Sequence, residues 1–268
     1  MSSRSEYVTW EVNSLLSKET ERRYLDQVIQ YYHESLLNDD EAMEYLRQRG
    51  IENPVLLSKF KVGFADRTVG KLLPRGTTVK GETVRGILER YGLYKNTGHE
   101  LLRGCVVFPI FNESGDLVNA YGRRINYVSP GKGTPYRVIN PRSGSFFNEE
   151  VLENFSHVIL TSTPIEALTL MGLEVYNVFS TLGIMDFNQA HVARLEGSSV
   201  KQVDIVFANT ILGNRRSIVI SEALKAIGIA SKIARLPRGD DVNKLYLKTT
   251  VLKRMFSNFI NPDCITVH

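Results

Sequence analysis

The stretch that most constrains the fold is residues 157–172, where an apolar, β-branched run leads directly into a helical pattern. The run HVILT is typical of a buried strand. Thr163 then supplies a helix N-cap, Pro164 the first helical position, and Glu166 the third residue of a capping box. Further strand-like runs follow at 174–180, 202–208 and 231–236. Because strands alternate with helical patterns, the sequence predicts a parallel sheet with helices on its faces, an α/β fold.

The residues that follow the predicted strands are the candidates for a functional site. In an open parallel sheet, ligands bind outside the carboxyl ends of the strands. The positions there are Ser162, Gly183, Ala208, Asn209, Thr210 and the loop Pro-Arg-Gly-Asp-Asp at 237–241. A tight turn between a strand and a helix is enough to explain Gly183.

Short motifs on both sides of this region extend the pattern. They are AMEYLRQRGI at 42–51, FKVGF at 60–64, VFPI at 107–110, YGRR at 121–124 and LPRGDD at 236–241. In this order and spacing, residues 31–245 resemble the catalytic core of bacterial DnaG-type primases, which joins a basic subdomain to a Toprim domain. The resemblance implies a Toprim-like parallel-sheet domain preceded by a mixed α+β basic subdomain.

The resemblance divides the chain into three parts. An N-terminal helical segment is expected over residues 1–36, which carry apolar residues at helical spacing. A basic primase-like subdomain is expected over residues 37–148, and a degenerate Toprim-like domain over residues 149–268. Alternation around 60–64 predicts a half-buried strand in the second part. For the helix after the second sheet strand, we predict a cap at Asp186.

The family's metal-binding carboxylates, carried over residue by residue, fall mostly on uncharged positions of this chain. The first-strand glutamate falls on Ser162, and the two aspartates that end the third strand fall on Ala208 and Thr210. A further aspartate of the first helix falls on Glu166, which the capping box already explains. Mg²⁺ takes charged oxygen ligands and neutralises the charge that develops in phosphoryl transfer. The resemblance therefore implies a degenerate site, and we assign no catalytic residue.

Asp240 and Asp241 are the remaining acidic residues near the strand ends and the weak candidates for metal ligands. We expect the chain to need no cofactor. Mg²⁺ or Mn²⁺ enters only in the alternative that the chain is an active enzyme using these two aspartates.

Basic residues are concentrated in one part of the chain. Residues 51–142 hold 15 basic and 7 acidic side chains, a net charge of +8. A predicted hairpin, with strands at 105–111 and 117–121, brings the arginines before its first strand and after its second strand to the same end. Tyr121, Tyr127 and Tyr136 are interleaved with the basic residues, which suits phosphate contact and base stacking. We predict nucleic-acid binding by Arg103, Arg123, Arg124, Lys132, Arg137 and Arg142, against the alternative of a solvated basic face.

Three functions remain open at this point. In the first, the chain is a primase-derived nucleic-acid-binding protein of DNA replication or of a mobile element, without primer synthesis on its own. Alternatively, it is an active DNA primase or nucleotidyltransferase that uses Asp240, Asp241 and a partner protein, or a protein–protein module built on a Toprim-like scaffold. Loss of the carboxylates argues against the second function and the basic region argues against the third, so we favour the first.

The expected partner is single-stranded DNA or RNA. Bacterial primases carry a zinc ribbon ahead of the catalytic core, and this sequence has two cysteines, Cys105 and Cys264, and no Cys/His cluster. A zinc-ribbon protein, a helicase or another replication protein stays open as a partner. No apolar run approaches the length of a membrane span, so we expect a cytoplasmic protein without a membrane partner. Each of the five histidines is interpreted as a surface or strand residue.

Overall fold

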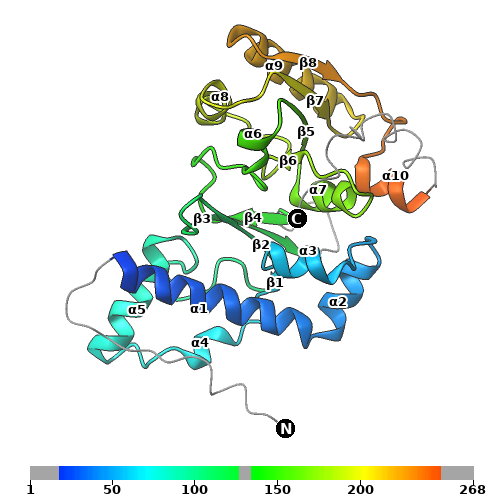
Figure 1. Ribbon diagram of the computed structural model, residues 1–268. Helices are drawn as coiled ribbons and strands as arrows, with labels where there is room; N and C mark the ends of the chain where they lie inside the picture. Colours follow the sequence, from blue (N-terminus) through cyan, green and yellow to red (C-terminus); the bar gives the residue numbers. More distant parts are fainter. Residues whose placement is uncertain (1–17, 127–133, 249–268) are drawn as a thin grey trace. The chain divides into compact units, whose positions relative to one another are not determined.

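The computed structural model describes residues 18–126 and 134–248, and Figure 1 shows its elements. The chain divides into two units. The first contains the residues up to Tyr45 together with Leu57–Asn140, and the second contains Leu46–Leu56 together with the residues from Pro141 onward. The three-part division expected from the sequence, with boundaries after residues 36 and 148, remains a prediction.

The first unit combines helices with an antiparallel sheet of strand order β1-β2-β3-β4. Its strands are β1 (Gly63–Phe64), β2 (Cys105–Phe111), β3 (Leu117–Arg124) and β4 (Tyr136–Val138). Its helices are α1 (Lys18–Leu37), α4 (Val69–Leu72) and α5 (Val79–Arg90). The helices α2 (Asp40–Arg47) and α3 (Pro54–Lys59) contain residues of both units.

Helix α1 packs one apolar face into the core of the first unit. Its buried hydrophobic residues recur at helical spacing: Tyr24, Leu25, Val28, Ile29, Tyr31, Tyr32 and Leu36. Most of them share a core with Ile87 of α5 and Val107 of β2. The predicted helical pattern is therefore confirmed for the described part of residues 1–36, and residues 1–17 lie outside it.

The predicted hairpin is present, but its second strand is longer than expected. β2 has the predicted bounds, whereas β3 continues past Tyr121 to Arg124. The extension arises because β4 pairs with this part of β3, with Arg123 opposite Tyr136. Arg123 and Arg124 thus lie within a strand and do not follow it.

The strand predicted around residues 60–64 is mostly absent. Only Gly63 and Phe64 pair with β2. Lys61 has a positive φ of 45°, and its N–H donates to the carbonyl of Ser58 in a turn. This left-handed conformation is incompatible with an extended strand. The alternation of apolar and basic residues over 60–64 therefore does not produce a full strand.

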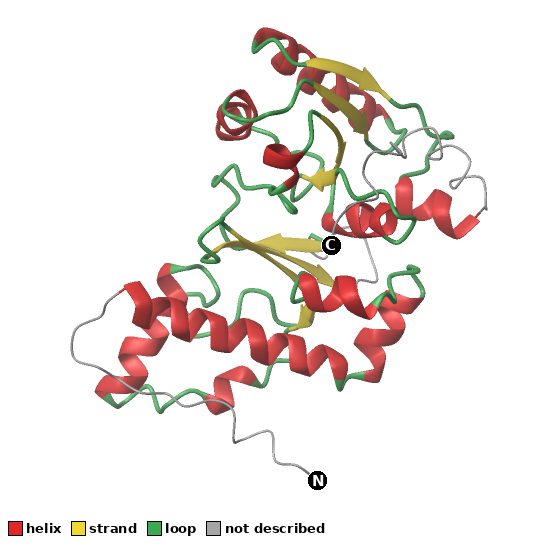
Figure 2. Ribbon diagram, in the orientation of Figure 1, coloured by secondary structure: helices red, strands yellow, loops and turns green. Residues whose placement is uncertain are grey.

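The second unit contains the predicted parallel sheet, in the order β6-β5-β7-β8, with helices beside it (Figure 2). Its strands are β5 (His157–Thr161), β6 (Val178–Ser180), β7 (Gln202–Val206) and β8 (Ala230–Ile233). Its helices are α6 (Val151–Asn154), α7 (Pro164–Met171), α8 (Gln189–Glu196), α9 (Ile211–Ala226) and α10 (Val242–Lys248). β6, β7 and β8 are shorter than the predicted strands, but all pair in parallel. The α/β fold with a preceding mixed subdomain is confirmed.

The start of α7 follows from its sequence. Thr163 has an extended backbone, and its hydroxyl accepts from the N–H of Glu166 at 3.4 Å. Pro164 takes the first helical position, where it has no N–H to leave unsatisfied. Every residue of α7 is buried, so this helix lies in the interior of the second unit.

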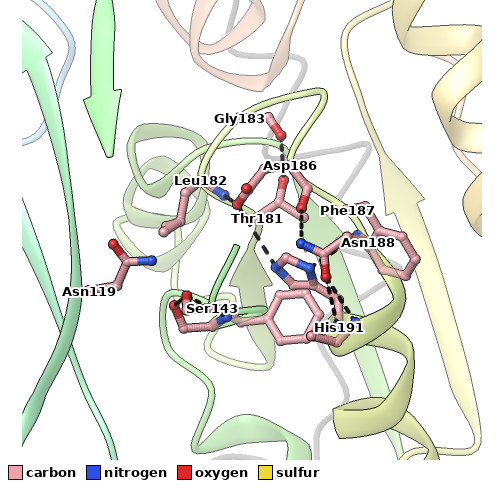
Figure 3. Close-up of polar contacts among 12 residues, drawn as sticks. Asn119, Ser143, Thr181, Leu182, Gly183, Asp186, Phe187, Asn188 and His191 are labelled. Carbon is pink, nitrogen blue, oxygen red and sulfur yellow. Dashed lines mark hydrogen bonds and ion pairs between the residues drawn. The ribbon is translucent and has the colours of Figure 1, made fainter. Parts of the chain in front are cut away.

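The start of α8 differs from the prediction, as Figure 3 shows. The cap is Asn188, whose side-chain oxygen accepts from the N–H of Ala190 at 2.9 Å. Asp186 instead accepts from the N–H of Leu182 at 3.1 Å and holds the preceding loop. His191 completes the cap because its Nδ1 accepts from the N–H of Asn188 at 3.2 Å. The predicted cap at Asp186 is therefore wrong.

His191 also differs from the surface or strand position expected of the histidines. It lies in α8 and is buried, and burial lowers its pKa to about 4. The ring is therefore neutral at physiological pH and acts as a structural cap. None of the helices in the described ranges is long and apolar enough to cross a membrane.

Candidate functional site

Arginines gather at one end of the β2–β3 hairpin. In the sheet register, Cys105 lies opposite Arg124, and Val106 lies opposite Arg123. Arg137 of β4 lies opposite Gly122, next to these two residues. Arg103 is exposed and comes two residues before β2 begins. The structure thus brings these four predicted residues to one end of the sheet.

A fifth arginine, Arg67, joins this end of the sheet. The N–H of Ala65 donates to the carbonyl of Cys105 at 3.0 Å, and the N–H of Gly104 donates to the carbonyl of Ala65 at 2.7 Å. These bonds hold the segment after β1 beside the start of β2. Arg67 has a positive φ of 72°, and its guanidinium lies close to Gly104. We define the arginine cluster as Arg67, Arg123, Arg124 and Arg137.

The four guanidinium groups of the arginine cluster act on the same buried thiol. Burial raises the pKa of Cys105 to about 11, although each of these arginines favours the thiolate. The thiol is therefore protonated at neutral pH and has no nucleophilic character. The four positive charges thus gather at one end of the sheet, with Arg124 and Arg137 on the face of Cys105 and Arg123 on the other face.

The charge of the arginine cluster is not balanced by carboxylates. Among the described residues, none of the four forms an ion pair, and the Nε of Arg124 is buried without a hydrogen-bond partner. Elsewhere in this unit, Arg90 pairs with Glu21 at 2.6 Å and Arg22 with Asp116 at 3.4 Å. Grouped positive charge without acidic partners is suited to an anion such as a phosphate.

The aromatic residues contribute differently from the prediction. Tyr121 is fully buried. The centroid of its ring lies 5.9 Å from that of Phe108, and the ring of Tyr136 stacks on it with a centroid distance of 5.5 Å. The prediction that a base stacks on Tyr121 is therefore wrong, because no face of its ring is accessible. Tyr136 is half-buried and lies opposite Arg123 across the β3–β4 pair, so its ring is the one suited to stacking.

The remaining residues of the predicted interface lie elsewhere. Lys132 and Tyr127 fall outside the described residues. Arg142 is exposed and belongs to the second unit. The sequence missed Arg67, whose position could have been inferred only by pairing the strand at Phe64 with the strand at Val106.

At the strand ends of the second unit, neutral residues have structural roles. Thr210 is the N-cap of α9, and its hydroxyl accepts from the N–H of Gly213 at 3.0 Å. The carbonyl of Ala208 lies so close to this turn that a Cβ on Gly213 would approach it to 1.9 Å. The strand-to-helix turn is therefore packed tightly around uncharged groups.

Glu166 places its carboxylate at the end of β5. Its Oε2 accepts from the N–H and from the hydroxyl of Ser162, both at 2.8 Å. Burial, together with the negative charge of Asp241, raises the pKa of Glu166 to about 7. Thr163 caps the helix as expected, and the carboxylate of Glu166 bonds to Ser162 in addition to the backbone of Thr163.

The two aspartates after β8 are also engaged. Asp240 is buried and forms an ion pair with Lys248. Asp241 accepts from the N–H of Lys244 at 2.8 Å, as an N-cap of α10 does, and its other oxygen lies 3.6 Å from the Lys244 ammonium. In the part of the chain that the structure describes, no group of three or more His, Cys, Asp or Glu residues converges as a metal site.

Comparison with known proteins finds similarity to DNA primases. Residues 31–156 match the model of the family described as DNA primase catalytic core, N-terminal domain. The DNA primase of Aquifex aeolicus (strain VF5) is 27% identical over 228 residues, which cover 81% of this chain and 44% of that protein. The chain thus spans less than half the length of this relative.

Solved structures show the same fold. The Aquifex aeolicus primase, comprising its zinc-binding and RNA polymerase domains, matches 94% of this chain and 63% of its own at a TM-score of 0.72 and 23% identity. A DnaG primase catalytic domain bound to single-stranded DNA matches 92% of this chain and 86% of its own at a TM-score of 0.68 and 17% identity. At these identities, the likeness establishes the fold of the core.

Proposed function

We propose that this chain, which has the fold of DnaG-type primase catalytic cores, binds single-stranded nucleic acid through the arginine cluster and makes no primers on its own. The single observation that carries the proposal is the grouping of four arginines at one end of the sheet without acidic partners among the described residues. Support comes from a relative, since a DnaG catalytic domain of the same fold was solved with single-stranded DNA bound.

The geometry suggests how a single strand would be held. Arg123 and Arg124 are consecutive in β3, so their side chains point to opposite faces of the strand end. Each guanidinium can bind one phosphate through two parallel hydrogen bonds. Tyr136, which lies opposite Arg123 on the same face of the sheet, offers a ring for a base. Such contacts give affinity without sequence preference, because phosphates and base faces are common to all nucleotides.

The family resemblance implies a divalent cation at the strand ends, and the residues present do not fit one. Ser162, Ala208 and Thr210 carry no charge, and the hydroxyl of Thr210 already caps α9. Asp240 is paired with Lys248. Mg²⁺ gives up its water reluctantly and needs charged ligands in near-octahedral geometry. We therefore derive no chemical step through a metal.

One observation favours the alternative of an active primase. The carboxylate of Glu166 lies at the end of β5 and is electrostatically coupled to Asp241, so two acidic groups are close at this site. A partner protein that added a third carboxylate would complete a set of ligands. Under this alternative, primer synthesis requires that partner together with Mg²⁺ or Mn²⁺.

We place the protein in DNA replication or in the maintenance of a mobile element. A helicase, a zinc-ribbon protein or another replication protein is the proposed partner, and the cytoplasm is the proposed location. Pull-down with the purified replication proteins of the host would identify such a partner.

The proposal is tested by fluorescence anisotropy with single-stranded DNA and RNA oligonucleotides at several salt concentrations. The double variant Arg123→Ala, Arg124→Ala should bind more weakly to all sequences, and its salt slope should fall by about 0.7 for each phosphate that it no longer neutralises. The matched control is Arg75→Ala, Lys95→Ala, which removes the same charge from exposed loops of the same unit. Binding by the arginine variant that equals the control at every salt concentration would refute the interface.

The second part of the proposal is tested by template-directed primer synthesis with Mg²⁺ and with Mn²⁺. The parent chain should bind the template and make no product. Synthesis by the purified chain alone, abolished in Asp241→Asn, would refute this part of the proposal.

A further inference from the structure

Helix α9 has one buried face and one apolar face turned to solvent. Gly213, Ser217, Ile220 and Leu224 are buried, at the spacing of one helix face, and the helix packs against β7 and β8. On the other side, Ile211 is 79% exposed, Leu212 45%, Ile218 53% and Val219 47%. Single exposed apolar residues are ordinary, but four large ones on one helix indicate an interaction surface.

Two opposite charges lie in the middle of this exposed face. Arg215 and Glu222 are both exposed, and they are seven residues, about two turns, apart. On the helix they fall between the row Ile211 and Ile218 on one side and the row Leu212 and Val219 on the other. Within the described ranges, neither charge has a partner of opposite sign.

We propose that α9 is the interface of a homodimer, in which two copies of the helix pair antiparallel about a two-fold axis. With the axis passing between Ile218 and Val219, these two residues contact each other across it. Arg215 of one copy then faces Glu222 of the second copy, and the reverse contact is made as well. A two-fold interface requires this self-complementarity, because the same surface is used by both partners.

The charge pattern selects a second copy as the occupant. Arg215 and Glu222 lie at equal distances on either side of the central pair, so the symmetric arrangement neutralises both charges and a parallel one does not. The apolar rows supply the driving force, and the ion pairs fix the register. A surface of one helix is small, so the dimer should form reversibly and depend on concentration. The inference is independent of nucleic-acid binding, because the arginine cluster belongs to the first unit.

Sedimentation velocity over a wide range of concentrations tests the proposal on the full chain. The parent should change from monomer to dimer as concentration rises. Arg215→Glu places like charges opposite each other twice and should weaken dimerisation about tenfold or more. The swapped variant Arg215→Glu, Glu222→Arg restores opposite charges and should recover dimerisation to near the parent level.

The control is Lys201→Glu, the same change of charge at an exposed position outside α9, which should dimerise as the parent does. Circular dichroism confirms that each variant is folded, as expected for exposed side chains. A parent that stays monomeric at every concentration overturns the proposal. A dimer that Arg215→Glu does not weaken, or that the swapped variant does not restore, overturns it too.

Discussion

The buried carboxylate of Glu166 has a strongly raised pKa in the second unit. Its bonds to Ser162 favour the charged form, but burial and the charge of Asp241 outweigh them and raise the pKa from 4.5 to about 7. The folded chain therefore holds a proton at this site over a pH range in which the unfolded chain has released it. Ionisation at this position opposes folding.

The pH dependence of stability follows from this shift. Between pH 4.5 and 7 the folded state binds more protons than the unfolded state, so this contribution is fully present below pH 4.5 and is lost as pH rises to about 7. The loss amounts to about 3 kcal/mol of unfolding free energy. Glu166→Gln cannot ionise, so it should gain stability relative to the parent by about this amount over the same range.

Urea unfolding at a series of pH values measures the difference. Glu153→Gln, a change at an exposed position of α6, is the control and should follow the parent. Curves for the parent and Glu166→Gln that stay parallel across the range would contradict the assignment.

Some of these residue roles could be predicted from the sequence, and others depend on distant contacts. The hairpin pattern was enough to bring Arg103, Arg123 and Arg124 to one end of the sheet. Arg67 could not be predicted, because its place depends on the pairing of β1 with β2 and on a left-handed backbone. Glu166 was expected in a capping box with Thr163, and its side chain bonds to Ser162 as well as to the backbone of Thr163.

Among the elements, the turn from β7 into α9 is tightly packed. Only four residues separate Val206 from Ile211, and the hydroxyl of Thr210 and the backbone of Gly213 complete the turn. A side chain on Gly213 would meet the carbonyl of Ala208, which is backbone and cannot rotate away.

We therefore expect Gly213→Ala to lower the free energy of unfolding by about 2–4 kcal/mol, because the helix start must shift to make room. The matched control is Gly86→Ala in the middle of α5, where an added Cβ would meet no atom within 4 Å. That change should stabilise the chain by about 0.5–1 kcal/mol, since alanine favours the helix. Thermal and urea unfolding of both variants provide the measurement, and equal effects of the two changes would refute the packing argument.

The positions of the elements in the second unit follow from the sequence more closely than their ends do. Apolar runs and the Thr163-Pro164 signal were enough for β5 and α7. The start of α8 was not predictable from Asp186 and Gln189, because both Asp186 and Asn188 can accept hydrogen bonds there. The carboxylate of Asp186 accepts from the backbone N–H of Leu182, so Asn188 caps the helix. Strand ends were overestimated, since pairing with neighbours and not hydrophobicity determines where a strand stops.

At the scale of the whole molecule, the two candidate sites belong to different units. The arginine cluster lies in the first unit and the strand-end residues lie in the second. Nucleic-acid binding and metal binding should therefore respond to separate sets of substitutions, which makes each measurable without the other.

Restoring the three missing carboxylates tests this separation. The triple variant Ser162→Glu, Ala208→Asp, Thr210→Asp should gain Mg²⁺ and Mn²⁺ binding by calorimetry, because it supplies charged oxygen ligands. Aspartate at position 210 can still cap α9. Binding of single-stranded DNA without metal should be unchanged. Tight metal uptake by the parent, abolished by Asp240→Ala, would show that the present residues already form a site.

Cys105 gives the native protein an internal reporter. Its thiol is buried where β2 begins, and with a pKa of about 11 it holds almost no thiolate at neutral pH. A thiol reagent can modify it only when this end of the sheet opens. In a chain whose Cys264 is replaced by serine, the rate of modification therefore measures a local opening equilibrium, separate from global unfolding. The same sulfur atom would register how far an oligonucleotide holds that end closed.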